Sequence, residues 1–152
     1  MKSPRFILTI FLICGMAFNA CSQSSQVPVD VFVGSTPSGA FIKSSLGIPD
    51  SCEFIKWELT LMKSKNGVGQ FQFTTLYGVS QPNTNGFKRG GKKIAASGQY
   101  TIDKNFYRLQ SKDIPSPLFL LKMDDNIFHF TDSNKKLLIG NGGWGYVLNR
   151  LK

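Results

Sequence analysis

The chain has 152 residues, with 18 lysines and arginines against 9 aspartates and glutamates, which gives a formal net charge of +9. Its length accommodates one domain rather than two, and a chain of this size folds without a disulfide framework. The positive charge favours anionic partners, but no basic helix or RNA-binding signature points to a nucleic acid.

The N-terminus has the layout of an export signal. Lys2 and Arg5 give it a positive start, residues 6–18 are almost wholly apolar, and the small residue Ala20 directly precedes Cys21. The apolar run is too short for a membrane-spanning helix, which needs about 20 residues. The arrangement resembles a bacterial lipoprotein signal, in which the cysteine carries the lipid and becomes the first residue of the mature chain.

A polar segment rich in serine and glutamine follows the cysteine and suits a tether for an anchored domain. The sequence therefore predicts, in chain order, a signal peptide (1–20), a lipidated cysteine with its tether (21–30) and a single domain (31–152). Ser22 after the cysteine resembles outer-membrane sorting in enterobacteria, so we expect a lipid-anchored protein of the bacterial cell envelope, in the outer membrane. Phe18 and Asn19 are uncommon in such signals, and ordinary cleavage after residues 15–17 would instead release a secreted protein.

Everything after the tether has the pattern of β-structure. Residues 55–61 alternate between apolar and polar side chains, residues 71–77 do the same, and Asn66-Gly67 between them is a hairpin turn signal. A third strand is predicted at 94–100. Shorter segments continue the pattern between turn residues, at 106–110, 118–123, 127–131, 137–139 and 144–148.

No segment longer than the signal has helical periodicity. Short strands at regular spacing predict an all-β fold, and we expect a small antiparallel β-barrel of about eight strands, with a sandwich as the alternative. Closure into a barrel removes the exposed sheet edges that a small all-β domain must otherwise protect. Gly140–Gly145 matches a dinucleotide-binding pattern by its letters alone, and because no βαβ unit can follow it, we interpret it as a glycine-rich turn.

A barrel of this size either holds one small molecule or fills its interior with side chains. The large residues that could line or fill such an interior are Trp57, Phe71, Phe73, Tyr77, Tyr100 and Trp144. A carrier of a small apolar or amphipathic ligand is therefore one functional hypothesis. The long loop after Tyr77 is a candidate surface for an anionic partner, or else a solvated loop, and its basic residues are Lys88, Arg89, Lys92 and Lys93.

Several short segments resemble the N-terminal domain of NlpE-type bacterial lipoproteins. They are Pro49-Asp50-Ser51-Cys52-Glu53 before the first long strand, Leu76-Tyr77-Gly78 at the end of the next, Ser97-Gly98-Gln99-Tyr100, and Phe130-Thr131-Asp132-Ser133. The similarity covers residues 33–150 and rests on strand patterns. It implies a lipid-anchored, lipocalin-like β-barrel from a family associated with copper resistance and with envelope-stress or surface-contact signalling.

The chain departs from this family at its metal motif. The family typically carries Cys-x-x-Cys before the first long strand, whereas here Cys52 matches the second cysteine and Pro49 replaces the first. A thiolate pair suits Cu(I), but one thiol cannot chelate alone, so copper binding is not carried over. Cys52 and His129 stay as candidate metal ligands, joined by Met62 or Met123 only if the barrel gathers them. Otherwise Cys52 is a buried structural thiol.

His129 is the chain's only histidine and lies in the middle of a predicted strand. Nothing in the sequence marks the serine and acid that a catalytic triad would need around it. We therefore expect a protein without enzymatic activity and without a cofactor, which binds or senses a partner on a β-barrel scaffold. Its expected contacts are the membrane, through the lipid anchor, and either an envelope protein or a small apolar ligand.

Overall fold

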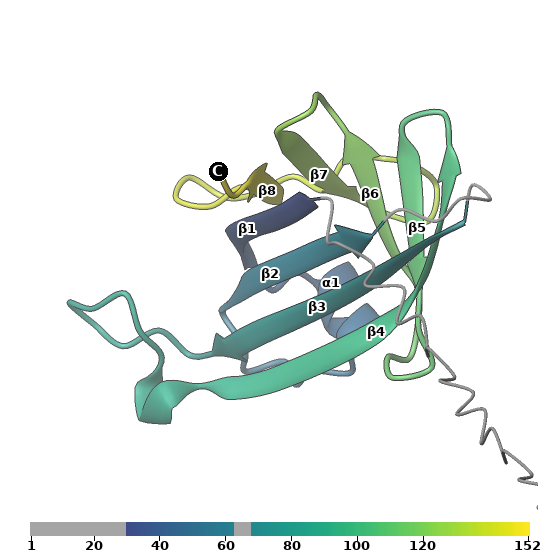
Figure 1. The fold of residues 1–152 in the computed structure, drawn as a ribbon. Coiled ribbons are helices and arrows are strands. Elements are labelled where there is room, and N and C mark those ends of the chain that lie inside the picture. Colours follow the sequence, from purple (N-terminus) through teal and green to yellow (C-terminus); the bar gives the residue numbers. More distant parts are fainter. Residues whose placement is uncertain (1–29, 63–67) are drawn as a thin grey trace, which may run out of the picture.

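The computed structural model describes residues 30–62 and 68–152. The predicted export signal, Cys21, most of the predicted tether and the predicted Asn66-Gly67 turn lie outside these residues. Within them, the eight strands form one closed antiparallel barrel, in which each strand pairs with the next along the chain and β8 pairs back with β1 (Figure 1). The expected small all-β barrel is confirmed. No α-helix in the described ranges is long and apolar enough to cross a membrane.

The elements follow one another along the chain with mostly short connections. In order they are β1 (Asp30–Pro37), α1 (Ala40–Leu46), β2 (Phe54–Met62), β3 (Gly69–Gly78), the 3-10 turn η1 (Lys88–Gly90), β4 (Lys92–Asp103), β5 (Phe106–Gln110), β6 (Leu118–Lys122), β7 (Ile127–Thr131) and β8 (Val147–Arg150). The strands β2 to β7 lie where the alternating pattern predicts them. β1 starts at Asp30, the residue at which the tether was expected to end.

The hairpin of β2 and β3 shows why these residues form a barrel wall. Trp57 pairs with Thr75 and Leu59 pairs with Phe73, and all four side chains are buried. Glu58, between the two β2 residues, is exposed. Because successive side chains of a strand point to opposite faces, the alternating sequence gives the hairpin an apolar inner face and a polar outer face. The predicted hairpin is confirmed.

Aromatic side chains from non-adjacent strands meet inside the barrel. Phe32 of β1 contacts Phe128 of β7 edge to face, with ring centroids 4.7 Å apart, and the rings of Trp57 and Phe130 are 4.8 Å apart. The indole Nε1 of Trp57 donates a hydrogen bond of 2.9 Å to the Thr36 hydroxyl, so this buried polar atom is satisfied. Packing of this kind fills the space between the strands with side chains.

A short helix between β1 and β2 corrects the expectation that everything after the tether is β-structure. α1 contributes Ile42 and Leu46, which are 0% and 4% exposed, to the same core cluster as the strands. It ends where Gly47 takes a φ of 67°, a conformation that glycine adopts without strain. Figure 1 shows the helix behind β2, β3 and β4. Its seven residues make about two turns, too few for helical periodicity to stand out in the sequence.

The connection between β7 and β8 contains a detour. The Leu138 N–H donates to the Phe130 carbonyl over 3.0 Å, which places residue 138 beside the end of β7. Residues 139–145, which we call the excursion loop, then leave the sheet. Pairing resumes where the Phe130 N–H donates to the Tyr146 carbonyl over 2.9 Å. The chain therefore meets the same edge of β7 twice, before and after the detour.

This detour overturns two predicted strand positions. The strand predicted at 137–139 is wrong, because only a single bridge joins Leu137 to Thr131. The strand predicted at 144–148 is displaced, since β8 begins at Val147. The glycine-rich turn predicted at Gly140–Gly145 does lie in the excursion loop. Gly140 is needed there because a Cβ would lie 1.9 Å from the Trp144 carbonyl oxygen, whereas no glycine of the loop takes a positive φ.

Candidate functional site

The residues predicted to line or fill the interior do not share one environment. In the core cluster, with at most 5% exposure, are Trp57, Phe71, Phe73 and Tyr100. Tyr77 is half-buried and packs against this core from the end of β3. Trp144 lies outside the barrel, in the excursion loop, and is 44% exposed. The interior is thus occupied by side chains, and the exposed residues of the outer wall line other depressions, described below.

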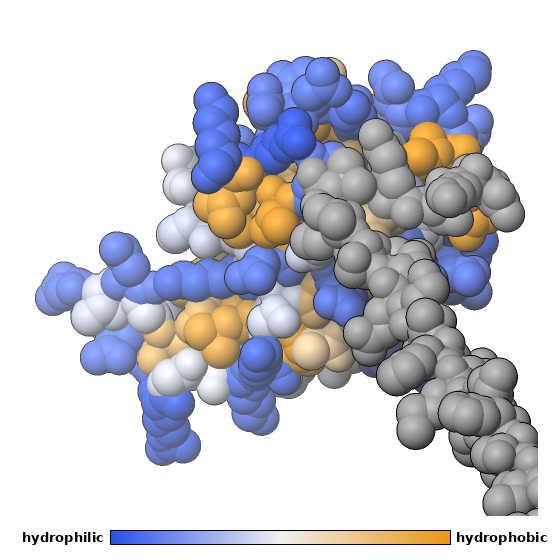
Figure 2. All heavy atoms as spheres, in the orientation of Figure 1, coloured by the Kyte–Doolittle hydropathy of each residue, from blue (hydrophilic) through white to orange (hydrophobic). Residues whose placement is uncertain are grey.

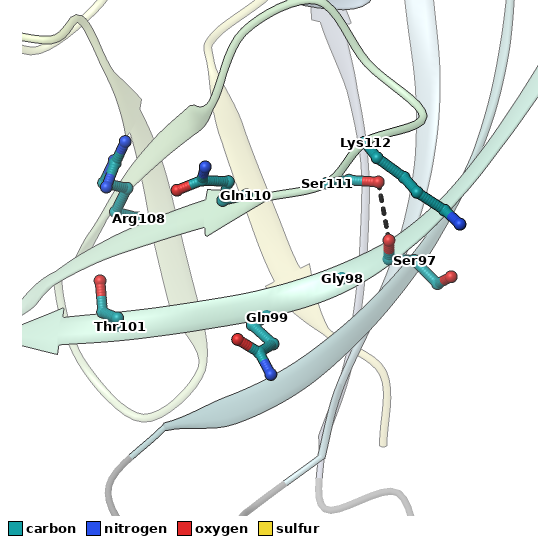
Figure 3. Close-up of a pocket in the computed structure, with 8 residues that line it drawn as sticks. All are labelled: Ser97, Gly98, Gln99, Thr101, Arg108, Gln110, Ser111 and Lys112. Carbon is teal, nitrogen blue, oxygen red and sulfur yellow. Dashed lines mark hydrogen bonds between the residues drawn. The ribbon is translucent and has the colours of Figure 1, made fainter.

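The outer surface is largely hydrophilic on the face seen in Figure 2, with separate hydrophobic areas over the strands. One depression of about 570 Å³ lies where the pairing of β4 and β5 ends (Figure 3). We call it the β4–β5 pocket. Its lining comes from both strands and from the residues after β5: Ser97, Gly98, Gln99, Thr101, Arg108, Gln110, Ser111 and Lys112.

The main chain shapes the β4–β5 pocket. Strand pairing stops at Gln99 and Gln110, and beyond it the Ser111 hydroxyl donates to the Ser97 carbonyl over 2.7 Å (Figure 3). Gly98 is required at this point, because a Cβ there would lie 2.1 Å from the Gln110 carbonyl oxygen. The close approach of the two backbones therefore depends on glycine at position 98. Beyond the last paired residues, the Ser111 side chain makes a hydrogen bond between the two chain segments in place of a backbone pair.

A row of glutamines crosses three strands at this pocket. Gln70 of β3 lies opposite Gln99 of β4, which lies opposite Gln110 of β5, and all are exposed. Amide groups both donate and accept hydrogen bonds, and Arg108 and Lys112 add positive charge. No histidine, cysteine, aspartate or glutamate lines this pocket. The arrangement suits binding of a polar molecule more than acid–base catalysis.

The predicted anionic-partner loop is gathered in part around a second depression, of about 490 Å³, which we call the basic pocket. Lys88, Arg89 and Lys92 line it, together with Tyr77 and Cys52. Lys93, the next residue of β4, is not among the lining residues. Several cations around one depression favour an anionic group there. The structure therefore brings three of the four predicted basic residues to one place.

The candidate metal ligands are engaged in other contacts. Cys52 is 5% exposed, and its thiol donates to the Phe54 carbonyl over 3.4 Å. His129 is half-buried on β7, with Nδ1 2.9 Å from the Phe130 carbonyl oxygen. Met62 ends β2 and Cys52 precedes its start, so the nine-residue strand, about 30 Å long, lies between them. Among the residues that the structure describes, no group of three or more His, Cys, Asp or Glu side chains is placed to hold a metal ion.

Comparison with known proteins finds no matching family model, no matching curated protein and no matching solved structure. The β4–β5 pocket is one feature that sequence reasoning missed. Glutamines at alternate, outward positions of the strands were its only signal. Their alignment across β3, β4 and β5 appears once the register is known.

Proposed function

We propose that this chain is a non-enzymatic, lipid-anchored protein of the bacterial cell envelope that binds or senses a partner on the outer surface of its barrel. The observation that carries the proposal is the signal-like N-terminus ending at Cys21, placed shortly before a barrel that begins at Asp30. Between them runs a polar spacer with a relaxed span of about 17 Å on a flexible-chain estimate. The resemblance to NlpE-type lipoproteins supports the same combination of anchor and barrel.

The packing of the barrel supports binding on the outside. A carrier of a small apolar ligand, the alternative hypothesis, would need space among the core side chains, and rings such as Phe32 and Phe128 are in contact there. The β4–β5 pocket opens on the outer wall, and the basic pocket lies where β3 ends and β4 begins, beside Tyr77 and Cys52, which pack with the core. Copper binding has less support, because Pro49 stands where the family's first cysteine would be and the Cys52 thiol is hydrogen-bonded.

The side chains of the two outer pockets support binding rather than catalysis. Hydroxyls, amides and cations predominate, and the one thiol, Cys52, is buried. A nucleophile would need an adjacent base to be activated, and no histidine lines either pocket. Lys88, Arg89 and Lys92 favour a partner that carries phosphate or carboxylate groups.

The decisive experiment measures the intact mass of the full-length gene product extracted from bacterial membranes. We expect a chain that begins at Cys21 and carries the mass of attached acyl chains. A Cys21→Ala variant should leave the membrane fraction or stay unprocessed, because the residue that would carry lipid is gone. A mature chain that begins at Phe18 without acyl mass would remove the anchoring claim.

A further inference from the structure

A third pocket, of about 460 Å³, lies on the outer wall where the excursion loop meets the start of β2. Phe54 stacks with two rings beside it: its centroid is 4.2 Å from that of Phe87 and 5.4 Å from that of Trp144. Phe54 and Phe87 are 7% and 3% exposed, whereas Trp144 is 44% exposed and lines the pocket. We call it the Trp144 pocket. It presents an aromatic ring that is supported from behind.

The position of Trp144 is fixed by a tight turn. The Asn141 side-chain oxygen accepts hydrogen bonds from the N–H groups of Gly143, at 3.1 Å, and of Trp144, at 3.0 Å. The Asn141 N–H in turn donates to the Trp144 carbonyl over 3.0 Å. An asparagine that bonds the backbone ahead of it stabilises a turn. The turn therefore holds the backbone of Trp144 and stacking on Phe54 holds the indole before any ligand arrives, which lowers the entropic cost of binding.

The rim of the Trp144 pocket is polar and carries both signs of charge. The Glu53 carboxylate accepts hydrogen bonds from the Ser80 hydroxyl and from the Ser80 N–H, the latter at 2.8 Å, and these bonds lower its pKa. Across the pocket the Lys56 ammonium donates to the Asn85 carbonyl and lies 5.8 Å from the Phe87 ring centroid. A carboxylate and an ammonium on one rim leave little net charge for a ligand to neutralise.

We infer that the Trp144 pocket binds a saccharide, with one pyranose ring against the indole of Trp144. The carbon-bound hydrogens on one face of a pyranose pack well against the negative face of an aromatic ring. Its hydroxyls need donors and acceptors around that face, which the amide of Asn85, the side-chain NH2 of Asn141 and the second carboxylate oxygen of Glu53 supply.

Two other ligand classes fit this pocket less well. A wholly apolar ligand would cover the polar rim and leave its donors and acceptors without partners, which costs free energy. An anion would meet the Glu53 carboxylate here, and it finds better electrostatic complementarity in the basic pocket. A neutral sugar would pack one face on the Trp144 ring and form hydrogen bonds with the polar rim. The inference goes beyond the proposed function by naming a ligand class, and it rests on that proposal only for the claim that binding occurs on the outer surface.

The test uses the full-length protein in a detergent without a sugar head group, since an alkyl glycoside would compete for the site. Soluble cello-, malto- and chito-oligosaccharides are titrated separately, and the indole N–H signals of both tryptophans are followed by NMR. We expect at least one sugar to shift the Trp144 signal in a saturable way. The Trp57 signal should stay in place, because that ring is 4% exposed inside the barrel.

Variants separate recognition from loop structure. Trp144→Ala should weaken sugar affinity by about tenfold or more, and Asn85→Ala by a smaller factor of about three to five. Ile139→Ala is the matched control: it lies in the same excursion loop, is 84% exposed and does not line the pocket, so affinity should not change. Circular dichroism of each variant checks that the barrel is intact.

The inference is overturned if no sugar of the panel moves the Trp144 signal. It is also overturned if Asn85→Ala and Ile139→Ala both bind like the unaltered chain, a comparison that stands even where Trp144→Ala disturbs the loop. A lipidated protein that binds no sugar would contradict this inference and leave the anchoring claim standing. A protein that binds sugar but carries no acyl mass would contradict the anchoring claim and leave this inference standing.

Discussion

The barrel interior and the Trp144 pocket each contain one of the chain's two tryptophans. Trp57 is 4% exposed, and its indole N–H is bonded to the Thr36 hydroxyl. Trp144 is 44% exposed and rests on Phe54. The same side chain thus completes a packed core in one place and offers a ring to solvent in the other. The interior of this barrel thus provides stability, and on our proposal its outer wall provides recognition.

Truncating the two tryptophans should separate these roles most clearly. Trp57→Ala empties part of a packed interior and leaves the Thr36 hydroxyl without its partner, so the free energy of unfolding should fall by about 3–5 kcal/mol. Trp144→Ala removes a half-exposed ring and should cost less than about 1 kcal/mol. Urea denaturation followed by circular dichroism measures both. Equal losses would contradict the division between interior and outer wall.

Substitution of two glycines extends the comparison to the backbone, because one glycine lies in the barrel wall and the other in the excursion loop. In Gly98→Ala the new methyl group would meet the Gln110 carbonyl oxygen at 2.1 Å, so the strands must move and stability should drop by about 2 kcal/mol or more. Gly142→Ala in the excursion loop has no heavy atom within 4 Å of the new methyl group and should change stability by less than about 0.5 kcal/mol. Thermal unfolding of the pair provides the measurement. A Gly98→Ala variant as stable as the unaltered chain would mean that β4 and β5 can move apart here without loss of stability.

The smallest effect is expected on the outer wall, at acid pH. Hydrogen bonds from Ser80 lower the pKa of Glu53 from its ordinary value of 4.5. A carboxyl group whose pKa is lowered by folding adds stability above pH 4.5, and this stability is lost as the pH falls from 4.5 towards the lower folded pKa. Glu53→Gln should therefore lower the melting temperature slightly above pH 4.5, and its difference from the unaltered protein should disappear as the pH falls through that window. Identical curves for the two proteins would show that the contact with Ser80 does not stabilise the ionised carboxylate.

The hairpin of β2 and β3 could be predicted because its cause is local. Alternation along 55–61 decides which side chains are buried, whatever the rest of the chain does. The helix α1 could not be predicted in the same way. Its only sequence trace is the spacing of four between Ile42 and Leu46, and two residues do not make a period. Its burial depends on the core cluster of the strands, to which Ile42 and Leu46 contribute.

The outer pockets depend on contacts between distant parts of the sequence. Residues 144–148 contain apolar side chains that suggested a strand with an inward Trp144, yet the ring stacks on Phe54 from β2. The glutamine row likewise exists only through the register of three strands. Local patterns therefore identified the wall of the barrel, while its surface sites required the three-dimensional arrangement.

β1 is both the first strand of the barrel and the one joined to the proposed tether. It pairs with β2 over eight residue pairs but with β8 over only two. At that narrow seam the Asp30 carboxylate forms an ion pair with Arg150, and the Leu151 N–H donates to the Val31 carbonyl over 2.7 Å. A mechanical pull transmitted through a lipid anchor at Cys21 would act on β1 first. The seam between β1 and β8 is therefore where tension would open the barrel.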